Sequence, residues 1–273
     1  MQADKADKAD ITAALGKEKK LIKILKSLGK VAVAYSGGVD STYLMTVAKE
    51  TLGENSLALF VKGAMLAAAE EKEAQEFAAG LDFAFRVLEF DIFAENGFVE
   101  NSPQRCYYCK RALFSLLKSK ADMLGYHIVD GSNISDLGDF RPGLLALREL
   151  GVASPMLTAG LAKDEIRLLA NRRGLPNWNK PAQACLASRV PFGDRITPEI
   201  LIKVAAAEQV LTLLGFTERR VRFHGNITRI EIPSAQFALL LEHREEIVKE
   251  LNKLGLRYIT LDLEGIRSGS LNP

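Results

Sequence analysis

The sequence predicts an α/β fold, in which a parallel sheet forms a larger N-terminal domain and a small α+β domain follows it. Short apolar runs bounded by glycines alternate with helical patterns, which is the order of right-handed βαβ units. After about residue 192 the order changes to helix, two strands, helix and strand. The length of 273 residues suits two domains, which we place at 1–192 and 193–273.

Strands in the first domain are expected where apolar residues run without interruption or alternate. The clearest is 31–35 (Val-Ala-Val-Ala-Tyr), whose continuous apolar character is typical of a strand buried on both faces. Several predicted helices end at a glycine, because glycine readily takes the left-handed conformation that closes a helix. The strands are predicted at 31–35, 57–61, 83–87 and 127–129, and the helices from the cap Asp10 to Gly29 and at 40–52, 64–79, 107–124 and 163–173.

The second domain is predicted to combine helices with a small sheet. The dipeptide Gly225-Asn226 between two β-rich runs is typical of a hairpin turn. The helices are predicted at 198–214 and 237–251, and the strands at 220–223, 228–232 and 258–263.

Composition and charge narrow the class of protein. Hydrophobic residues make up 48% and charged residues 26%, which is usual for a folded domain and excludes disorder, collagen and coiled coil as the main architecture. No apolar run approaches the roughly 20 residues of a membrane span, and the N-terminus lacks the apolar core of a secretory signal. A net charge of +2 argues against a nucleic-acid partner. Three cysteines without a signal argue for a reducing cytoplasm.

A glycine-rich loop at residues 36–41 (S-G-G-V-D-S) follows the first strand and precedes a helix. Two glycines let backbone amides approach an anion, and the helix start adds the positive end of its dipole. Ser36 and Ser41 offer hydroxyl donors, and Asp40 suits a site where Mg²⁺ accompanies a phosphate. The spacing is neither that of a Walker A loop nor that of a dinucleotide fingerprint. A plain connecting turn is the alternative, but the motif resembles the PP-loop of the ATP pyrophosphatase (adenine nucleotide α-hydrolase-like) superfamily.

Two of the three cysteines share one face of a predicted helix. Cys106 and Cys109 are three residues apart, so both sulfurs can face one object, and Cys185 lies in a loop between the predicted domains. Buried structural cysteines, a thiol–disulfide couple, a zinc site and an iron–sulfur cluster are all compatible with this pattern. No fourth His or Cys lies nearby in sequence to complete a zinc site, and three cysteines suit a [4Fe–4S] cluster with one open iron.

Motifs along nearly the whole chain resemble those of one family. In order, they are S-G-G-V-D-S, C-Y-Y-C-K, V-D-G-S-N, D-F-R-P-G, W-N-K-P-A, C-L-A-S-R-V-P-F-G, R-V-R-F-H, R-I-E-I-P and L-E-G-I-R-S-G, spread over residues 11–272. They resemble the LarE family, ATP-dependent sulfurtransferases that make the nickel-pincer nucleotide of lactate racemase. The resemblance implies adenylation of the carboxylates of pyridinium-3,5-biscarboxylic acid mononucleotide, followed by replacement of oxygen with sulfur.

The cysteine pattern places the chain nearer to one branch of that family. One branch consumes a single cysteine five residues before the arginine of the Ser-Arg pair, and here that position is Ala184. The chain instead resembles a three-cysteine branch, in which Cys106, Cys109 and Cys185 hold a [4Fe–4S] cluster. The resemblance then implies that a sulfide on the fourth iron is the sulfur donor and that the enzyme turns over repeatedly.

The resemblance also implies roles for the remaining site residues. Ser36, Gly37, Gly38, Asp40 and Ser41 would bind pyrophosphate and Mg²⁺; Ala34, Val61 and Gly131 would line the adenine and ribose of ATP; Lys110 would meet a phosphate; and Ser188, Arg220, Arg222 and Arg267 would hold the phosphate of the mononucleotide substrate. Arg220 and Arg222 alternate along a predicted strand, so they share one face, and arginine binds phosphate bidentately. An exposed helix lysine and a solvated basic face are the respective alternatives for Lys110 and for the arginines.

The sequence suggests simpler roles for three further residues. Glu208 and Glu231 fit plain solvated glutamates better than metal ligands or arginine partners, and Arg189 fits a brace for the cysteine loop or a partner of an acid.

The resemblance implies a small nucleotide substrate, a sulfide donor and a homo-oligomer. Three other functions fit part of the pattern: a PP-loop tRNA thiolase, an iron–sulfur carrier without enzymatic activity, and an amidotransferase-type ligase. The thiolase fits less well because the net charge is small for an RNA-binding protein. The carrier would leave the phosphate loop unexplained, and the ligase would need a glutaminase domain, which the sequence does not show.

Overall fold

The protein is divided into two compact units that interleave along the chain. The structure, a computed structural model, describes residues 2–138, 142–181 and 185–267, with side chains from residue 11 onward. Unit 1 comprises Met1–Gly63, Ala68–Ile92 and Cys106–Gln183, and unit 2 comprises Ala64–Ala67, Phe93–Arg105 and Ala184–Pro273. The predicted boundary after residue 192 separates two continuous stretches, whereas unit 2 also includes two short earlier segments.

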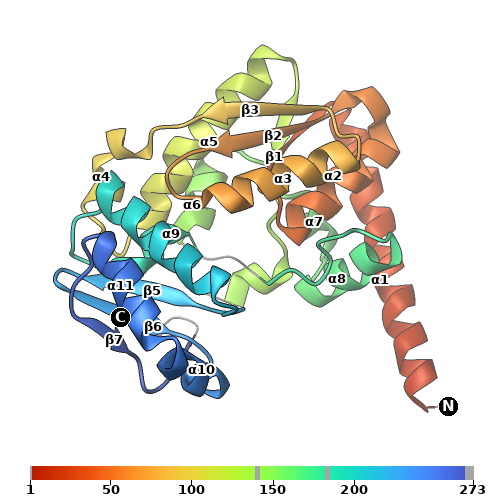
Figure 1. Cartoon of the computed structure of the whole chain (residues 1–273). Helices are drawn as coiled ribbons and strands as arrows, with labels where there is room; N and C mark the ends of the chain where they lie inside the picture. The colour runs from red at the N-terminus through yellow and green to blue at the C-terminus, as the bar shows by residue number, and fades with distance from the viewer. Residues whose placement is uncertain (1, 139–141, 182–184, 268–273) are drawn as a thin grey trace. The chain divides into compact units, whose positions relative to one another are not determined.

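Unit 1 is built on a four-stranded parallel sheet with the order β3-β2-β1-β4, of which Figure 1 labels β3, β2 and β1. The strands are β1 (Val31–Tyr35), β2 (Ser56–Lys62), β3 (Phe85–Glu89) and β4 (His127–Val129). Every neighbouring pair is parallel, which confirms the predicted α/β class. The predicted positions of β1 and β4 match the structure residue for residue.

Helices connect these strands and cover the sheet. They are α1 (Gln2–Leu28), α2 (Val39–Leu52), α3 (Ala68–Gly80), α5 (Arg105–Met123), α6 (Pro142–Glu149), α7 (Pro155–Ala159) and α8 (Lys163–Arg172), with the 3₁₀ turns η1 (Gly53–Asn55), η2 (Ile92–Ala94) and η3 (Ile134–Gly138). Two predicted helix starts were wrong. Asp10 is not a cap, because α1 begins at Gln2, and α3 begins at Ala68 rather than at residue 64. The short helices α6 and α7 were not predicted.

Helices α2 and α5 cover opposite faces of the sheet because the direction in which new strands are added reverses between β3 and β4. The strands β2 and β3 lie on one side of β1 and β4 on the other, so right-handed crossovers put α5 on the face opposite α2. On the α5 face, Ala32 and Leu59 form a buried cluster with Phe114 of α5 and Leu147 of α6. This packing fixes the carboxyl ends of β1, β2 and β4 along one edge of the sheet.

Unit 2 combines a three-stranded sheet with helices. Its elements are α4 (Asn96–Val99), η4 (Leu186–Arg189), α9 (Pro198–Leu213), β5 (Arg220–His224), β6 (Ile227–Glu231), η5 (Ser234–Gln236), α10 (Phe237–Glu242), α11 (Arg244–Lys253) and β7 (Ile259–Leu261). The sheet order is β5-β6-β7, with β5 and β6 antiparallel and β6 and β7 parallel. The predicted small sheet domain is therefore confirmed.

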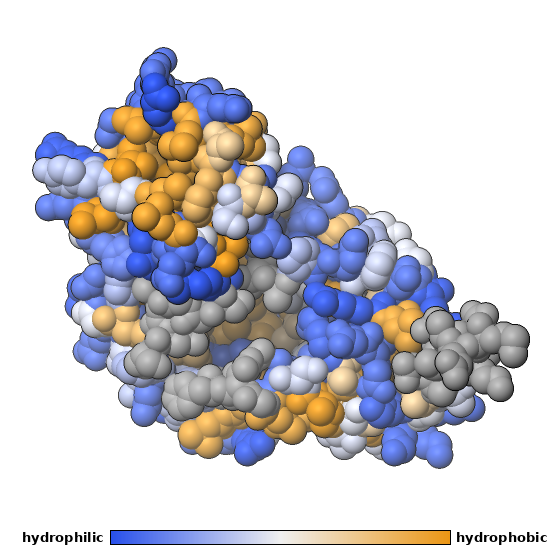
Figure 2. All heavy atoms as spheres, turned by 90° about the horizontal axis from the view of Figure 1, so that it is seen from below, coloured by the Kyte–Doolittle hydropathy of each residue, from blue (hydrophilic) through white to orange (hydrophobic). Residues whose placement is uncertain are grey.

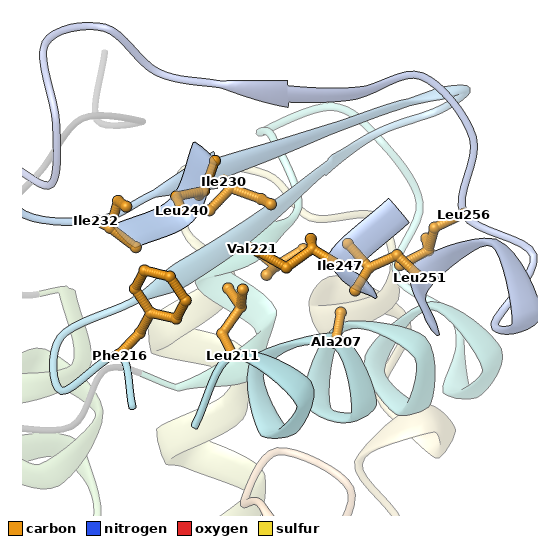
Figure 3. Packing of buried hydrophobic residues seen from close by; sticks show 10 residues of the cluster. All are labelled: Ala207, Leu211, Phe216, Val221, Ile230, Ile232, Leu240, Ile247, Leu251 and Leu256. Carbon is orange, nitrogen blue, oxygen red and sulfur yellow. The ribbon is translucent and has the colours of Figure 1, made fainter. Parts of the chain in front are cut away.

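Apolar side chains from every layer of unit 2 meet in one core (Figure 3). Leu211 of α9, Val221 of β5 and Ile247 of α11 are all buried in this cluster. The single helix predicted at 237–251 was wrong, because α10 ends at Glu242, α11 begins at Arg244, and His243 separates them. The bend between the two helices lets Leu240 and Ile247 enter the same core.

The surface mixes polar and apolar side chains. Figure 2 shows hydrophilic residues over much of one face, with apolar residues gathered in patches between them. Large exposed apolar residues of unit 2 include Ile202, Leu213, Leu241, Tyr258 and Leu263. Among the described helices, none is long and apolar enough to cross a membrane.

Replacing a buried leucine of β2 should cost much of the stability of unit 1. Leu59→Ala removes a side chain that is 0% exposed, and we expect the free energy of unfolding to fall by about 2–5 kcal/mol. Urea unfolding followed by circular dichroism measures the change. Leu145→Ala on α6 is the matched control, because Leu145 is 54% exposed and its loss should change stability little. Equal effects of the two substitutions would contradict this description of the core.

Candidate functional site

The carboxyl ends of β1 and β4 mark the point where the sheet order reverses. β1 lies between β2 and β4, while the chain runs from β1 to β2 and β3 before it returns to β4. Open parallel sheets bind ligands outside the carboxyl ends of their strands at such a switch point. The loop of residues 36–41 follows β1 directly, and Gly131 follows β4. The fold therefore places the predicted phosphate loop at the usual ligand position of its class.

The shape of the loop requires glycine at position 37. Gly37 has φ of 75°, a left-handed conformation that side chains other than glycine rarely adopt. A Cβ atom at this position would lie 2.5 Å from Cβ of Ala74 on α3. The loop thus packs directly on α3, and any larger residue would push it away.

The first turn of α2 offers backbone amides to an anion. Gly38 is the N-cap of α2 and provides no side-chain cap, so the first amides of the helix are available to a ligand. The hydroxyls of Ser36 and Ser41 lie 3.1 Å apart, and Ser41 Oγ accepts a hydrogen bond from the amide of Ser36 (3.1 Å) and donates one to the carbonyl of Gly38 (3.1 Å). These bonds close the loop around the helix start and give it the form of a phosphate cradle.

Asp40 supplies a carboxylate beside this cradle. Burial raises the pKa of Asp40, and the ammonium of Lys163, which pairs with its Oδ2, opposes that rise. The second oxygen, Oδ1, is buried and has no hydrogen-bond partner among the residues that the structure describes. Because Mg²⁺ takes carboxylate oxygens as ligands, this oxygen fits a metal ion that accompanies a phosphate. The donor set of the loop is therefore compatible with a magnesium–nucleotide complex.

The predicted adenine and ribose residues lie along the same edge of the sheet. Ala34 and Val61 are half-buried near the ends of β1 and β2 and pack against the cluster on the α5 face. Gly131 approaches the start of α2 closely, because a Cβ there would lie 3.4 Å from the amide nitrogen of Ser41 and 3.5 Å from Cβ of Asp40. The structure thus brings Gly131 against the phosphate loop.

Two residues at this site were missed in the sequence. Lys163 is the first residue of α8, where a cation opposes the helix dipole, and this unfavourable placement was a usable signal for an acidic partner. Asn177 is buried, and its Nδ2 donates to the carbonyl of Gly37 (2.8 Å) and to Oγ1 of Thr42 (2.9 Å). It lies 140 residues from Gly37, so no local pattern could have found it.

The thiols lie in both units. Cys106 and Cys109 occupy the first turns of α5 in unit 1, where Cys106 is exposed and Cys109 is half-buried. Cys185 is exposed in unit 2, and its carbonyl accepts bonds from the amide (2.9 Å) and the hydroxyl (2.7 Å) of Ser188. Within either unit, the described residues include no group of three His, Cys, Asp or Glu that could hold a metal. Ala184 lies outside the described residues.

Lys110 lies against an aromatic ring in this structure. Its Nζ is 4.9 Å from the centroid of the Phe114 ring, and its side chain packs on Gly143 at the start of α6. Its predicted contact with a phosphate stays a prediction.

The predicted substrate arginines cluster in unit 2. Arg222 is buried, and its guanidinium binds both oxygens of Glu231 (3.0 Å each) and the carbonyl of Ser188. Arg220 donates to the carbonyl of Arg267 (2.7 Å). Burial lowers the pKa of Arg220, and the neighbouring positive charges of Arg222 and Arg189 lower it further. A bound anion would stabilise Arg220, because its negative charge offsets both the lost hydration of the buried guanidinium and the repulsion from neighbouring arginines. The structure therefore links Ser188 to Arg222 and Arg220 to Arg267.

The interpretation of the two glutamates as solvated was wrong. Glu231 is 0% exposed, and its carboxylate accepts hydrogen bonds from Arg229 as well as from Arg222. Glu208 pairs with Arg189 through a bond of 2.7 Å, which confirms that Arg189 has an acidic partner. Buried carboxylates require such partners, because an ion without one is costly in a protein interior.

The fold and the loop together define a class of protein. A parallel α/β unit with a Ser-Gly-Gly-x-Asp-Ser loop at its switch point is a PP-loop protein, and it occurs here with a small C-terminal sheet unit. No protein-family model matches the chain. The chain is 40% identical over 248 residues to an uncharacterized protein of Synechocystis sp., covering 90% of this chain and 92% of that protein.

Two further relatives match over almost their whole length. One is the pyridinium-3,5-bisthiocarboxylic acid mononucleotide synthase of Lactiplantibacillus plantarum, which is 38% identical over 258 residues, or 94% of each chain. The other is an uncharacterized protein of Methanocaldococcus jannaschii, which is 30% identical over 257 residues, or 92% of this chain and 98% of that protein. The chain therefore belongs to the LarE family, and it is an enzyme of the sulfurtransferase class.

Adding one methyl group at position 37 should abolish anion binding at the loop. Gly37→Ala forces an unfavourable left-handed alanine, at about 1–2 kcal/mol, and a clash with Ala74, so the loop must move. Isothermal titration with inorganic pyrophosphate and Mg²⁺ measures the loss. Gly16→Ala in α1 is the control, because nothing lies within 4 Å of a Cβ at that site. Unchanged pyrophosphate binding in Gly37→Ala would rule out the loop as the anion site.

Proposed function

We propose that the protein is an ATP-dependent sulfurtransferase that adenylates the carboxylates of pyridinium-3,5-biscarboxylic acid mononucleotide and converts them to thiocarboxylates, as a step in nickel-pincer nucleotide biosynthesis. The observation that carries the proposal is the loop of residues 36–41, with open helix amides and a buried carboxylate at the switch point of the sheet. The relative from L. plantarum, named for making the bisthiocarboxylic acid mononucleotide, supports the substrate.

Adenylation makes a carboxylate oxygen into a good leaving group. A substrate oxygen attacks the α-phosphorus of ATP, pyrophosphate leaves into the cradle formed by Gly37, Gly38 and Ser41, and an acyl adenylate results. Sulfide then attacks the carbonyl carbon, and the bond to AMP breaks, which leaves a thiocarboxylate. Mg²⁺ held by Asp40 would neutralise charge on the phosphates. Lys163 lies at the same carboxylate and adds a positive charge beside the loop.

The arginine cluster of unit 2 suits the phosphate of the mononucleotide. We assign this role chiefly to Arg220, whose positive charge is crowded by Arg222 and Arg189, with Ser188 and Arg267 beside them. Arg222 is bound to Glu231 and Ser188, so it shapes the site and adds positive charge. The planar guanidinium of Arg220 can bind two phosphate oxygens at once.

Sulfur delivery is assigned to the three thiols. Cys106, Cys109 and Cys185 would hold a [4Fe–4S] cluster, since thiolates are its usual ligands and two of these thiols share one helix face. When bound, the cluster would supply sulfide from the iron that no cysteine binds. The position that a sacrificial cysteine would occupy is Ala184, which supports repeated turnover.

The setting of the reaction follows from the same proposal. An external sulfide donor must recharge the enzyme after each transfer, and a cytoplasmic location provides the reducing conditions that thiols and clusters require. The proposal includes assembly into a homo-oligomer, for which the exposed apolar residues of unit 2, such as Ile202 and Leu213, offer contact surface.

Removing the charge of Asp40 should abolish AMP formation while the protein stays folded. Asp40→Asn keeps the shape of the side chain but weakens the proposed metal site. AMP formed from ATP and the biscarboxylate substrate, measured by mass spectrometry, should fall by about a hundredfold or more. Asp122→Asn, an exposed carboxylate on α5, is the control. Normal turnover by Asp40→Asn would refute the assignment of the loop.

Each of the three thiols should be needed for the iron site. Cys106→Ala, Cys109→Ala and Cys185→Ala should each lose the brown absorbance and most of the iron of anaerobically reconstituted protein, because a cluster that lacks one of its cysteine ligands is weakly held. Ser119→Ala, an exposed residue of α5, should keep both signals. Full iron content in any cysteine variant would remove that residue from the ligand set.

A further inference from the structure

Two buried polar side chains, Asn101 and Arg105, bind the segment that follows Cys185. We propose that they are positioning residues that fix the backbone segment behind Cys185 within unit 2. This inference rests on the proposed transfer of sulfur through the cysteines. Neither residue was singled out from the sequence.

Asn101 joins three points of the segment 190–194. Its Nδ2 donates to the carbonyls of Pro191 (2.6 Å) and Asp194 (2.9 Å), and its own carbonyl accepts from the amide of Gly193 (3.1 Å). Asn101 is 0% exposed and has φ of 55°, a conformation that asparagine tolerates better than most residues. A buried amide with this many backbone bonds holds the segment in one shape.

Arg105 extends the same network toward Cys185. It is 7% exposed, and its Nη1 donates to Oδ1 of Asn101 and to the carbonyl of Ala187 (3.0 Å). Its guanidinium lies 4.9 Å from the centroid of the Phe192 ring. None of the ion pairs between described residues involves Arg105, so carbonyl oxygens and an aromatic face stabilise its charge.

The bound segment begins two residues after Cys185. The turn η4 starts at Leu186, and the carbonyl of Cys185 accepts bonds from the amide and the hydroxyl of Ser188. The bond from Arg105 to Ala187 therefore holds the turn that carries Cys185. Arg105 is also the residue directly before Cys106 in the chain.

The position of Cys185 matters because the rate of sulfur transfer depends on how the reacting groups are placed. Small displacements of a reacting group reduce rates strongly, whereas nucleotide activation at residues 36–41 uses other residues. Loss of the clamp formed by Asn101 and Arg105 should thus slow sulfur transfer and spare adenylation. A residue that served only global stability would affect both steps together.

Glycine at position 101 isolates the side-chain bonds. Asn101→Gly keeps the left-handed backbone without strain but removes the amide group. We expect hydrogen exchange of the amides of Val190, Gly193 and Ile196 to accelerate about tenfold or more, since each lost bond weakens the segment. Asn226→Gly, an exposed turn residue of the same unit, is the control. Exchange at the wild-type rate in Asn101→Gly would overturn the proposal.

The two half-reactions then separate positioning from stability. In Asn101→Gly, thiocarboxylate formation should fall about tenfold or more, while ATP–pyrophosphate exchange and the KM for ATP stay within about twofold. Arg105→Lys should keep more transfer activity than Arg105→Met, because lysine retains the charge and a donor, and Arg257→Lys is the exposed control. Equal loss of both half-reactions, or unchanged transfer, would overturn the positioning role.

The same assays distinguish failure of the proposed sulfurtransferase function from failure of the positioning role alone. If wild-type protein formed AMP but no thiocarboxylate, the sulfurtransferase proposal would fail, and the positioning role would fall with it. If wild-type protein formed thiocarboxylate and Asn101→Gly formed it equally fast, only the positioning role would fail.

Discussion

The candidate site depends on one backbone constraint, the left-handed conformation at Gly37. It lets the loop after β1 turn against Ala74 and places the first amides of α2 at the carboxyl edge of the sheet. Asn177 donates a hydrogen bond to the carbonyl of the same glycine. The hydroxyls of Ser36 and Ser41, the start of α2 and Asp40 all belong to this short loop and the first turn of the helix. The anion site therefore arises from the backbone conformation of the loop more than from charged side chains.

Buried charge is organised differently in the two units. In unit 1, Asp40 keeps one oxygen without a partner among the described residues and pairs the other with Lys163, an arrangement that a bound cation would complete. In unit 2, Glu231 is fully buried and already satisfied by Arg222 and Arg229, while Arg220 is crowded by positive charge. The first arrangement favours a metal ion with its phosphates, and the second favours an anionic group of a substrate.

Local patterns predicted much of the fold and the loop, because they depend on neighbours in sequence. The strand at 31–35, the glycine-rich turn and the helix after it are all encoded within about twenty residues. The contacts of Lys163, Asn177 and Asn101 join distant segments, and only the folded chain shows them. Glu231 was misjudged for the same reason, since burial of a charged residue depends on partners across the sheet. Two short early segments, Ala64–Ala67 and Phe93–Arg105, pack with the C-terminal part, and no local pattern in the sequence points to that packing.

The proposed adenylation of a substrate carboxylate at the loop is tested most directly with an oxygen isotope. The biscarboxylate substrate is labelled with oxygen-18 in its carboxylates and incubated with the enzyme, ATP, Mg²⁺ and sulfide. The AMP and pyrophosphate produced are then analysed by mass spectrometry. Adenylation predicts one oxygen-18 atom in the phosphate of AMP and none in pyrophosphate, because the labelled oxygen leaves with AMP. Unlabelled AMP formed together with thiocarboxylate would contradict the account.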